Sequence, residues 1–190
     1  MTKKIFVVML VILTSTIGTS LFAMRFMVEA GGAYNSARVT VTGGGTADSE
    51  ESFGIQAGVG AYDLFKMGPL QTDLMLRFIQ KSWGSDWANN YIELYPKFKY
   101  PVNETIQPFV GVGVGFLIST EKFAEDNMNS LDLSLGAGVD YLIGENLVVG
   151  AAYNFSLLPA YEWKYDYGYG LKGSWEFSHN TLTISVGYLF

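Results

Sequence analysis

The sequence predicts an all-β protein, an eight-stranded antiparallel up-and-down β-barrel that crosses a membrane. Three observations lead to this prediction. Apolar residues alternate with polar or small residues in eight segments, which is the pattern of strands with two unlike faces. Charged residues of both signs share the second face with glycines. Short and long connections also alternate along the chain, as they do when hairpins join the two ends of one barrel.

The composition supports one β-rich domain. The 190 residues include 22 glycines, 12 tyrosines and 13 phenylalanines, which suits strands and turns. There is no cysteine, which excludes disulfides and thiolate metal sites. A single histidine further limits catalytic and metal-binding chemistry, so no cofactor or metal site is predicted.

The first 23 residues have the pattern of a secretory signal peptide. Lys3 and Lys4 precede an apolar run from residue 5 to residue 13, which is too short to span a bilayer. Cleavage after Ser20 or after Ala23 remains open. Residues 24–190 are the predicted barrel domain. Without the two lysines, ten basic and 18 acidic side chains remain, a net charge of −8, which argues against a nucleic-acid partner.

Each segment has one apolar face. The expected strands are 25–34, 52–62, 70–81, 91–100, 106–118, 131–142, 147–157 and 181–190. The apolar positions of the first four are Phe26, Val28, Ala30 and Tyr34, then Phe53, Ile55, Ala57, Val59 and Ala61, then Leu70, Leu74, Leu76 and Phe78, then Ile92, Leu94, Phe98 and Tyr100. Those of the last four are the even positions from Val110 to Ile118, the odd positions from Leu131 to Tyr141, the odd positions from Leu147 to Leu157, and Leu182, Ile184, Val186, Tyr188 and Phe190.

The opposite face carries five cations and five anions. They are Arg25, Glu29, Asp73, Arg77, Lys81, Glu93, Lys97, Lys99, Asp132 and Asp140. Glycines occupy many of the remaining positions on this face, among them Gly54, Gly58, Gly60, Gly111, Gly113, Gly115, Gly136, Gly138, Gly150 and Gly187.

A soluble barrel with an apolar interior is the alternative, and three features argue against it. Glycine weakens a solvated strand face but leaves room opposite large side chains inside a narrow barrel. Balanced charges are needed where charges are buried, because an unpaired buried charge is costly. Aromatic residues lie near both ends of the apolar face, as they do at the two interfaces of a bilayer. The apolar face is therefore expected to contact lipid, and the polar face to fill the lumen.

The connections indicate an orientation. The gaps at 63–69, 101–105 and 143–146 are short, and those at 35–51, 82–90, 119–130 and 158–180 are long. Outer-membrane barrels have short periplasmic turns and long external loops, so both termini are expected on the periplasmic side. Pro96 does not fit a closed barrel wall, so we expect a bulge there or a different register in that strand.

The segments "PFVGVGVGF" (108–116), "LSLGAGVDYLIGENLVVGAAYNF" (133–155) and "ISVGYLF" at the end of the chain resemble the small outer-membrane barrels of the opacity-protein and OmpA-transmembrane-domain (OmpX-like) type. The resemblance covers the mature chain. It implies that the last strand is a signal for the barrel assembly machinery, which involves Phe190, Tyr188, Val186 and Ile184. It does not separate the functions found among such barrels.

Two regions are candidate functional sites. His179 with Thr181 loosely resembles the His-x-Ser of a lipid A deacylase, but no acidic partner can be assigned, and no catalytic residue is predicted. The connection 158–180 is rich in aromatic residues and forms either an extended hairpin that packs on itself or on headgroups, or an external binding surface. The aromatic positions in question are Tyr161, Trp163, Tyr165, Tyr167 and Tyr169.

The predicted function is a structural or surface-interaction role in a bacterial outer membrane: membrane integrity, adhesion or host-factor binding through external loops. A narrow pore for small apolar solutes, as in OmpW-like barrels, and a lipid A acyl-modifying enzyme are the alternatives. The expected lumen network is Arg25, Glu29, Asp73, Arg77, Glu93, Lys97, Lys99, Asp132 and Asp140. Expected partners are outer-membrane lipid, lipopolysaccharide and the barrel assembly machinery, with surface ligands contacting the loops, and the expected state is a monomer.

Overall fold

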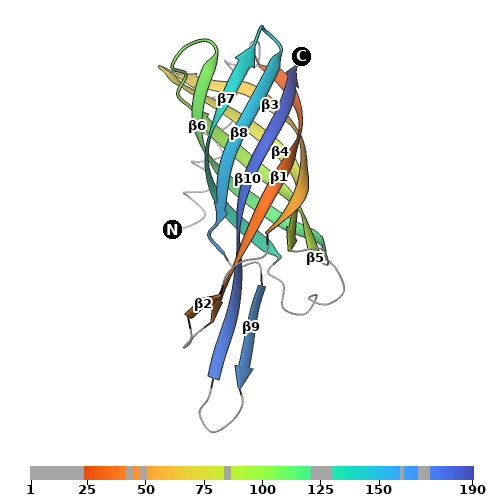
Figure 1. Ribbon diagram of the computed structural model, residues 1–190. Coiled ribbons are helices and arrows are strands. Elements are labelled where there is room, and N and C mark those ends of the chain that lie inside the picture. Colours follow the sequence, from red (N-terminus) through yellow and green to blue (C-terminus); the bar gives the residue numbers. More distant parts are fainter. Residues whose placement is uncertain are drawn as a thin grey trace, which may run out of the picture.

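The computed structural model describes residues 24–41, 45–47, 51–83, 87–120, 130–158, 161–166 and 172–190. Within these residues the chain forms ten strands, eight of which close into an antiparallel barrel (Figure 1). The predicted fold class is confirmed. No helix among the described residues is long and apolar enough to cross a membrane.

The strand bounds agree with the sequence prediction inside the barrel and extend beyond it mainly at the end that holds the long connections; β3 also continues at the other end, to Met67 instead of residue 62. The barrel strands are β1 (Arg25–Val41), β3 (Glu51–Met67), β4 (Leu70–Trp83), β5 (Trp87–Lys99), β6 (Ile106–Thr120), β7 (Leu131–Ile143), β8 (Leu147–Ser156) and β10 (Lys172–Leu189). Two further strands are β2 (Gly45–Ala47) and β9 (Tyr161–Asp166).

The first and last barrel strands close the sheet. Fifteen consecutive residue pairs join β1 to β10, from Met27 opposite Leu189 to Val41 opposite Trp175. All other barrel neighbours are consecutive in the chain except β1 and β3, which flank the inserted β2, and β8 and β10, which flank the inserted β9. Because the barrel is closed, none of its eight strands is left with an unpaired edge along the wall.

The two strand faces lie as the sequence predicted. The large apolar side chains of the alternating set are exposed on the outer surface, for example Phe53 at 79% and Ile184 at 61%. Charged and polar side chains of the other set are buried in the lumen. Aromatic residues ring the outer surface near both ends, where the Tyr34 and Phe53 rings lie 5.5 Å apart at one end and those of Tyr188 and Phe190 5.0 Å apart at the other.

The strand pairing in the barrel wall is irregular at positions other than Pro96, where an irregularity was predicted. The register between β5 and β6 shifts between Asn90 and Tyr91, whereas it is the same before and after Pro96. The expectation of a bulge or a changed register at Pro96 is therefore wrong. Pro96 pairs with Leu74 on β4, and its position in the wall is accommodated without an inserted residue.

A second irregularity lies in β3. Between Ala61 and Phe65, three residues of β3 stand opposite Asp73 alone. Asp63, in the middle of this bulge, has a φ of 56°, a left-handed conformation that aspartate tolerates better than most residues. The bulge lies near the end of the barrel that holds the short turns at 68–69, 100–105 and 144–146.

Four strands project beyond the opposite end of the barrel. Here β1 and β10 continue as a pair, β2 adds to β1, and β9 adds to β10. The order in this extension is therefore β2-β1-β10-β9 (Figure 1). The extended hairpin expected for residues 158–180 is present as β9 and the first part of β10.

Candidate functional site: the charged lumen and the external extension

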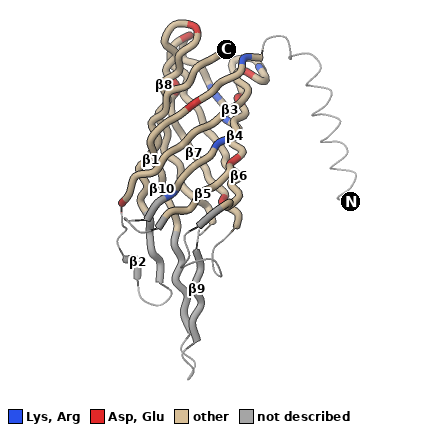
Figure 2. The backbone as a smooth tube through the Cα atoms, turned by 90° about the vertical axis from the view of Figure 1, so that its right-hand side faces the viewer, with Lys and Arg blue, Asp and Glu red and all other residues tan. Residues whose placement is uncertain are grey.

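Nine of the ten charged residues assigned to the inner face are buried in the lumen, each less than 5% exposed. Arg25, the tenth, lies at the end of the barrel, and its side chain is 35% exposed. Basic and acidic positions occur together along the barrel wall (Figure 2). They meet in three layers, described below from the extension toward the short turns.

In the outermost layer, the Lys81 ammonium forms an ion pair with the Asp132 carboxylate and donates to Ser156 Oγ at 3.1 Å. The same ammonium lies 5.5 Å from the centroid of the Tyr91 ring. Lys81 therefore neutralises Asp132 and lies against an aromatic ring. The surrounding lumen side chains are polar and buried: Asn35, Asn89, His179 and Thr181.

The central layer is built around Arg77. Its guanidinium forms an ion pair with Glu93 on the neighbouring strand and lies 3.4 Å from the centroid of the Tyr95 ring. Glu93 also accepts a hydrogen bond from Ser134 at 2.9 Å. The Tyr95 hydroxyl donates to Asn154 Oδ1 at 2.7 Å. The charged groups of this layer are thus paired, as burial requires, whereas Asn154 Nδ2 has no hydrogen-bond partner among the described residues.

Glycines make room for this layer. A Cβ added at Gly111 would overlap the Tyr95 ring, and one added at Gly113 would overlap the Glu93 carboxylate. At Gly58 the nearest atom would be Arg77 Cγ at 3.0 Å. These contacts explain why the inner face is rich in glycine. The narrow lumen has room for a large side chain from one part of the wall only where the facing residue has no side chain.

The central layer continues around Lys97. Its ammonium lies 3.2 Å from Asp140 Oδ2 and 3.9 Å from Glu29 Oε2. Gln56 Nε2 donates to Glu29 Oε1 at 3.2 Å. A void of about 10 Å³ lies beside these groups, room for about one water molecule. This void is far too small for a continuous aqueous path at this level.

The third layer lies at the β3 bulge. Lys99 contacts Asp73 at 2.7 Å and Asp63 at 3.1 Å. The Asp63 amide donates to Asp73 Oδ1 at 2.8 Å, which ties the bulge to β4. Lys66 and Arg25 reach the other Asp63 oxygen at 3.2 and 3.9 Å. Asp63 was not among the predicted lumen residues, because simple alternation assigns it to the short turn at 63–69.

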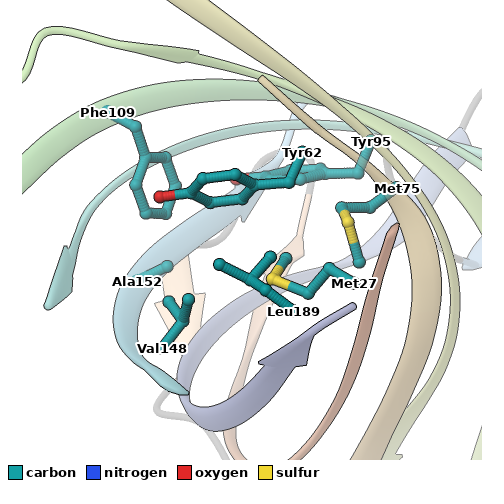
Figure 3. Close-up of a cluster of buried hydrophobic side chains, with 8 residues drawn as sticks. All are labelled: Met27, Tyr62, Met75, Tyr95, Phe109, Val148, Ala152 and Leu189. Carbon is teal, nitrogen blue, oxygen red and sulfur yellow. The ribbon is translucent and has the colours of Figure 1, made fainter. Parts of the chain in front are cut away.

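An apolar cluster near the same end was also missed. Tyr62, Tyr95 and Phe109 lie on one side of the lumen, and smaller apolar side chains lie across from them (Figure 3). The complete cluster is Met27, Tyr62, Met75, Tyr95, Phe109, Val148, Ala152 and Leu189. The signal in the sequence is the occurrence of methionine, phenylalanine and leucine at inner-face positions.

The last strand is fixed at its end. The Phe190 amide donates to the Phe26 carbonyl at 2.9 Å, and the Asn146 side chain donates to the Leu189 carbonyl at 2.6 Å. Leu189 is fully buried, whereas Phe190, Tyr188, Val186 and Ile184 are exposed on the outer surface. The four residues assigned to the assembly signal therefore lie in one row on the outer surface.

The aromatic residues of the external extension are only partly described. Tyr161, Trp163 and Tyr165 are in β9, opposite Phe177, Trp175 and Gly173 of β10. Tyr167 and Tyr169 lie outside the described residues. The odd numbering of β9 matches that of the outward positions of β8, yet its partner positions on β10 have the same parity as the buried residues His179 and Thr181. Odd or even numbering in β8 therefore does not predict which face a position of β9 lies on, because a loop separates the two strands.

His179 is 1% exposed and turned into the lumen, and Thr181 Oγ1 donates to Asn35 Oδ1 at 3.1 Å. The pair lies on the inner wall, away from the outer surface. Among the described residues, no group of three or more histidine or acidic side chains could hold a metal ion.

Comparison with known proteins supports the same architecture. A family model described as the outer membrane protein beta-barrel domain matches residues 25–190. Neisserial surface protein A is similar in structure, with a TM-score of 0.53 and 15% identity over 87% of this chain and 97% of that one. Ail, the attachment invasion locus protein of Yersinia pestis, gives 0.49 and 16% over 87% and 98%. No curated protein matches the sequence. At these identities the structural likeness concerns the fold alone.

Proposed function

The chain belongs to the outer membrane protein β-barrel family, and from that premise we propose that it is a surface-interaction protein of a bacterial outer membrane. The barrel anchors the chain, and the external extension makes the contacts. The observation that carries this proposal is the continuation of β1 and β10 beyond the barrel, where β2 and β9 widen them into a sheet.

The extension has the features of a binding platform. β9 pairs with β10 on one side, and no other described strand pairs with its second side. A free strand edge presents amides and carbonyls that an extended segment of another protein can pair with. Two long barrel strands hold this edge away from the membrane surface, so that an external partner can reach it.

The lumen supports an anchoring role rather than transport. The three charged layers and the apolar cluster fill it with paired or packed side chains, so solute passage would require several buried ion pairs to separate. Separating even one such pair without compensation costs about 3–5 kcal/mol. A narrow pore for apolar solutes is therefore the weaker proposal.

The orientation and the processing of the chain are part of the proposal. The short turns and both ends of the barrel domain lie in the periplasm, and the extension lies outside the cell. The signal peptide directs export and is removed by cleavage after Ser20 or Ala23, and the exposed row that ends in Phe190 is recognised by the barrel assembly machinery. Lipopolysaccharide surrounds the outer wall of a monomeric barrel.

Replacement of residues 160–176 by an Asn-Gly turn tests the proposal. The shortened chain should keep the different gel mobilities of boiled and unboiled barrels, while bacteria that display it should adhere to host cells no better than cells without the gene. A matched control, Glu145→Gln in a short turn of the opposite end, should adhere like the parent. Unchanged adherence of the shortened variant would refute the proposal.

The same variant separates adhesion from membrane integrity. A deletion strain that becomes sensitive to detergents, and recovers fully with the shortened chain, would assign an integrity role to the barrel by itself. An enzymatic role is not proposed, since the one histidine is buried in the lumen. His179→Ala should leave the acyl composition of lipid A unchanged, and a changed composition would reopen the enzymatic alternative.

A further inference from the structure

The charges buried in the lumen do not balance. Among the described residues, five acidic and four basic side chains are buried: Glu29, Asp73, Glu93, Asp132 and Asp140, and Arg77, Lys81, Lys97 and Lys99. Arg25, which balances the count in the sequence, lies at the end of the barrel, where it and the exposed Lys66 accompany Asp63. The buried network therefore carries one negative charge in excess.

The excess charge belongs to the central layer. In the outermost layer Lys81 is paired with Asp132. In the third layer Lys99 is paired with Asp73. The central layer has two cations and three carboxylates: Arg77 and Lys97, and Glu29, Glu93 and Asp140. Charges of opposite sign are matched one to one in the first two cases, and a carboxylate is left over in the third.

Glu29 is the least compensated of the three carboxylates. Its Oε2 lies 3.9 Å from the Lys97 ammonium, which is closer to Asp140 Oδ2, at 3.2 Å. Its Oε1 accepts a hydrogen bond from Gln56 Nε2 at 3.2 Å, a neutral donor. Glu29 is 3% exposed, and a buried carboxylate without a cation of its own costs free energy.

The void of about 10 Å³ beside these groups is bordered by oxygen atoms from several strands. Gln56, Asp140 and Ser185 border it from β3, β7 and β10. Gln56 is 3% exposed, and its Oε1 has no hydrogen-bond partner among the described residues. A Cβ added at Gly150 would lie 2.8 Å from Asp140 Oδ1 and 3.0 Å from Ser185 Oγ. The space that this glycine leaves open is thus faced by a carboxylate and a hydroxyl.

Two further contacts leave these oxygens able to accept another partner. The Lys97 ammonium is 3.2 Å from Asp140 Oδ2 and 3.5 Å from Asp140 Oδ1, so Oδ1 is the less engaged oxygen. Thr183, which also borders the void, donates its proton to the Ala152 carbonyl at 3.3 Å, and its oxygen is left as an acceptor. Phe109 and Ala152 of the apolar cluster border the same void (Figure 3).

We infer that this void binds a single sodium ion, which supplies the positive charge that the central layer lacks. Its ligands are Gln56 Oε1, Asp140 Oδ1 and the hydroxyl oxygens of Thr183 and Ser185. Hard cations take oxygen ligands of these kinds. Carbonyl and hydroxyl oxygens suffice for a monovalent ion, so the site does not require a group of three acidic side chains. The inference concerns the anchoring barrel and goes beyond the surface-interaction function.

Other occupants fit less well. A water molecule could donate to Gln56 Oε1, but it would leave the excess charge uncompensated. Calcium takes six to eight oxygen ligands and magnesium usually keeps several of its waters, whereas the void has room for about one water molecule. A sodium ion is smaller than a water molecule, so the surrounding oxygens can close around it. A potassium ion is about as large as a water molecule and leaves less room for this approach.

The test compares salts at constant ionic strength. The purified chain is refolded in phosphatidylcholine vesicles at neutral pH in 100 mM choline, potassium or sodium chloride, and urea unfolding is followed by gel mobility. Screening is the same in all three salts, so a difference reports binding of the cation. A site with a dissociation constant on the order of 10 mM would lower the equilibrium constant of unfolding about tenfold in sodium relative to choline. Potassium should have a smaller effect.

Substitutions in the central layer separate binding from a general change in stability. Glu29→Gln removes the excess charge. It should abolish the sodium response and, in choline, leave the barrel at least as stable as the parent. Ser185→Ala removes a ligand and should reduce the response several-fold. Ser134→Ala is the matched control, since this buried serine bonds to Glu93 and does not border the void. It should respond to sodium like the parent.

Three results would overturn the inference. Equal unfolding midpoints in the three salts would show that no cation binds and that a proton on one of the carboxylates balances the charge. A potassium response as large as the sodium response would remove the assignment to sodium. A full response in Glu29→Gln, or equal losses of response in Ser185→Ala and Ser134→Ala, would place the bound ion elsewhere. None of these results bears on adherence, so the proposed function is tested separately.

Discussion

Arg77 lies over the Tyr95 ring in the middle of the lumen, with its guanidinium carbon 3.4 Å from the ring centroid. The same guanidinium is paired with Glu93 from the adjacent strand. A cation buried in a narrow barrel is thus compensated twice, by a carboxylate and by the negative face of an aromatic ring. This arrangement holds the central strands together from the inside.

Removing one partner of this pair should destabilise the barrel. Arg77→Met leaves Glu93 buried and without its cation, and we expect a loss of about 3 kcal/mol in the free energy of unfolding. Arg77→Met combined with Glu93→Gln should recover a substantial part of the loss, because no unpaired charge remains. Urea unfolding in lipid vesicles, followed by gel mobility, measures both. Equal stability of the parent and the single variant would contradict the layered ion-pair account.

The glycines of the inner face should tolerate side chains according to what lies opposite. Gly111→Ala places a methyl group against the Tyr95 ring and should cost about 1–3 kcal/mol. Gly32→Ala, on the outer face of β1, is the control, since a Cβ there meets nothing within 4 Å. It should be neutral or slightly stabilising. If both variants unfold at the same urea concentration as the parent, the lumen is less tightly filled than described.

A filled lumen should not conduct ions. The central void of about 10 Å³ and the buried ion pairs around it predict no discrete current steps in planar bilayers at neutral pH. The pairs are also sheltered from solvent, so 1 M salt should change the free energy of unfolding little. Regular single-channel currents from purified, folded protein would show that the side chains of the lumen rearrange to open a path.

The C-terminal residue should affect assembly more than stability. Phe190 is 70% exposed on the outer wall, so Phe190→Ala should cost only about 1 kcal/mol during refolding in vitro, while the folded protein recovered from cell membranes should fall several-fold. Phe26→Ala removes an exposed aromatic side chain from the same end and serves as the control. If Phe26→Ala lowers recovery from cells as much as Phe190→Ala, the recognition role assigned to Phe190 is wrong.

Much of the barrel followed from sequence because its signals are local. Alternation over ten or more residues fixes the two faces of a strand, and the glycines and charges on one face indicate which of them is inside. The inner positions of Glu29, Arg77 and Asp140 could be predicted in this way. Register is equally constrained, because a shift by one residue would turn every charged side chain toward lipid.

The remaining features depend on positions that alternation does not encode. The β3 bulge directs Asp63 toward Lys99, and nothing in the surrounding residues distinguishes a bulge from a turn. The expectation at Pro96 failed because the missing hydrogen-bond donor was accommodated without changing the register. The face on which each position of β9 lies is set by its pairing with β10. Because a loop separates β8 from β9, the outward positions of β8 do not predict that face.

The placement of the two strand faces is tested most directly by labelling single cysteines along β6. The chain contains no cysteine, so each label is unique. Spin labels at Val110, Val112 and Val114, reconstituted in lipid vesicles, should be highly accessible to oxygen and shielded from a water-soluble nickel complex, with the greatest shielding at Val112. A label at Glu104, in a short turn, should show the reverse. If the nickel complex reaches Val112 as readily as Glu104, the apolar face does not contact lipid and the account is wrong.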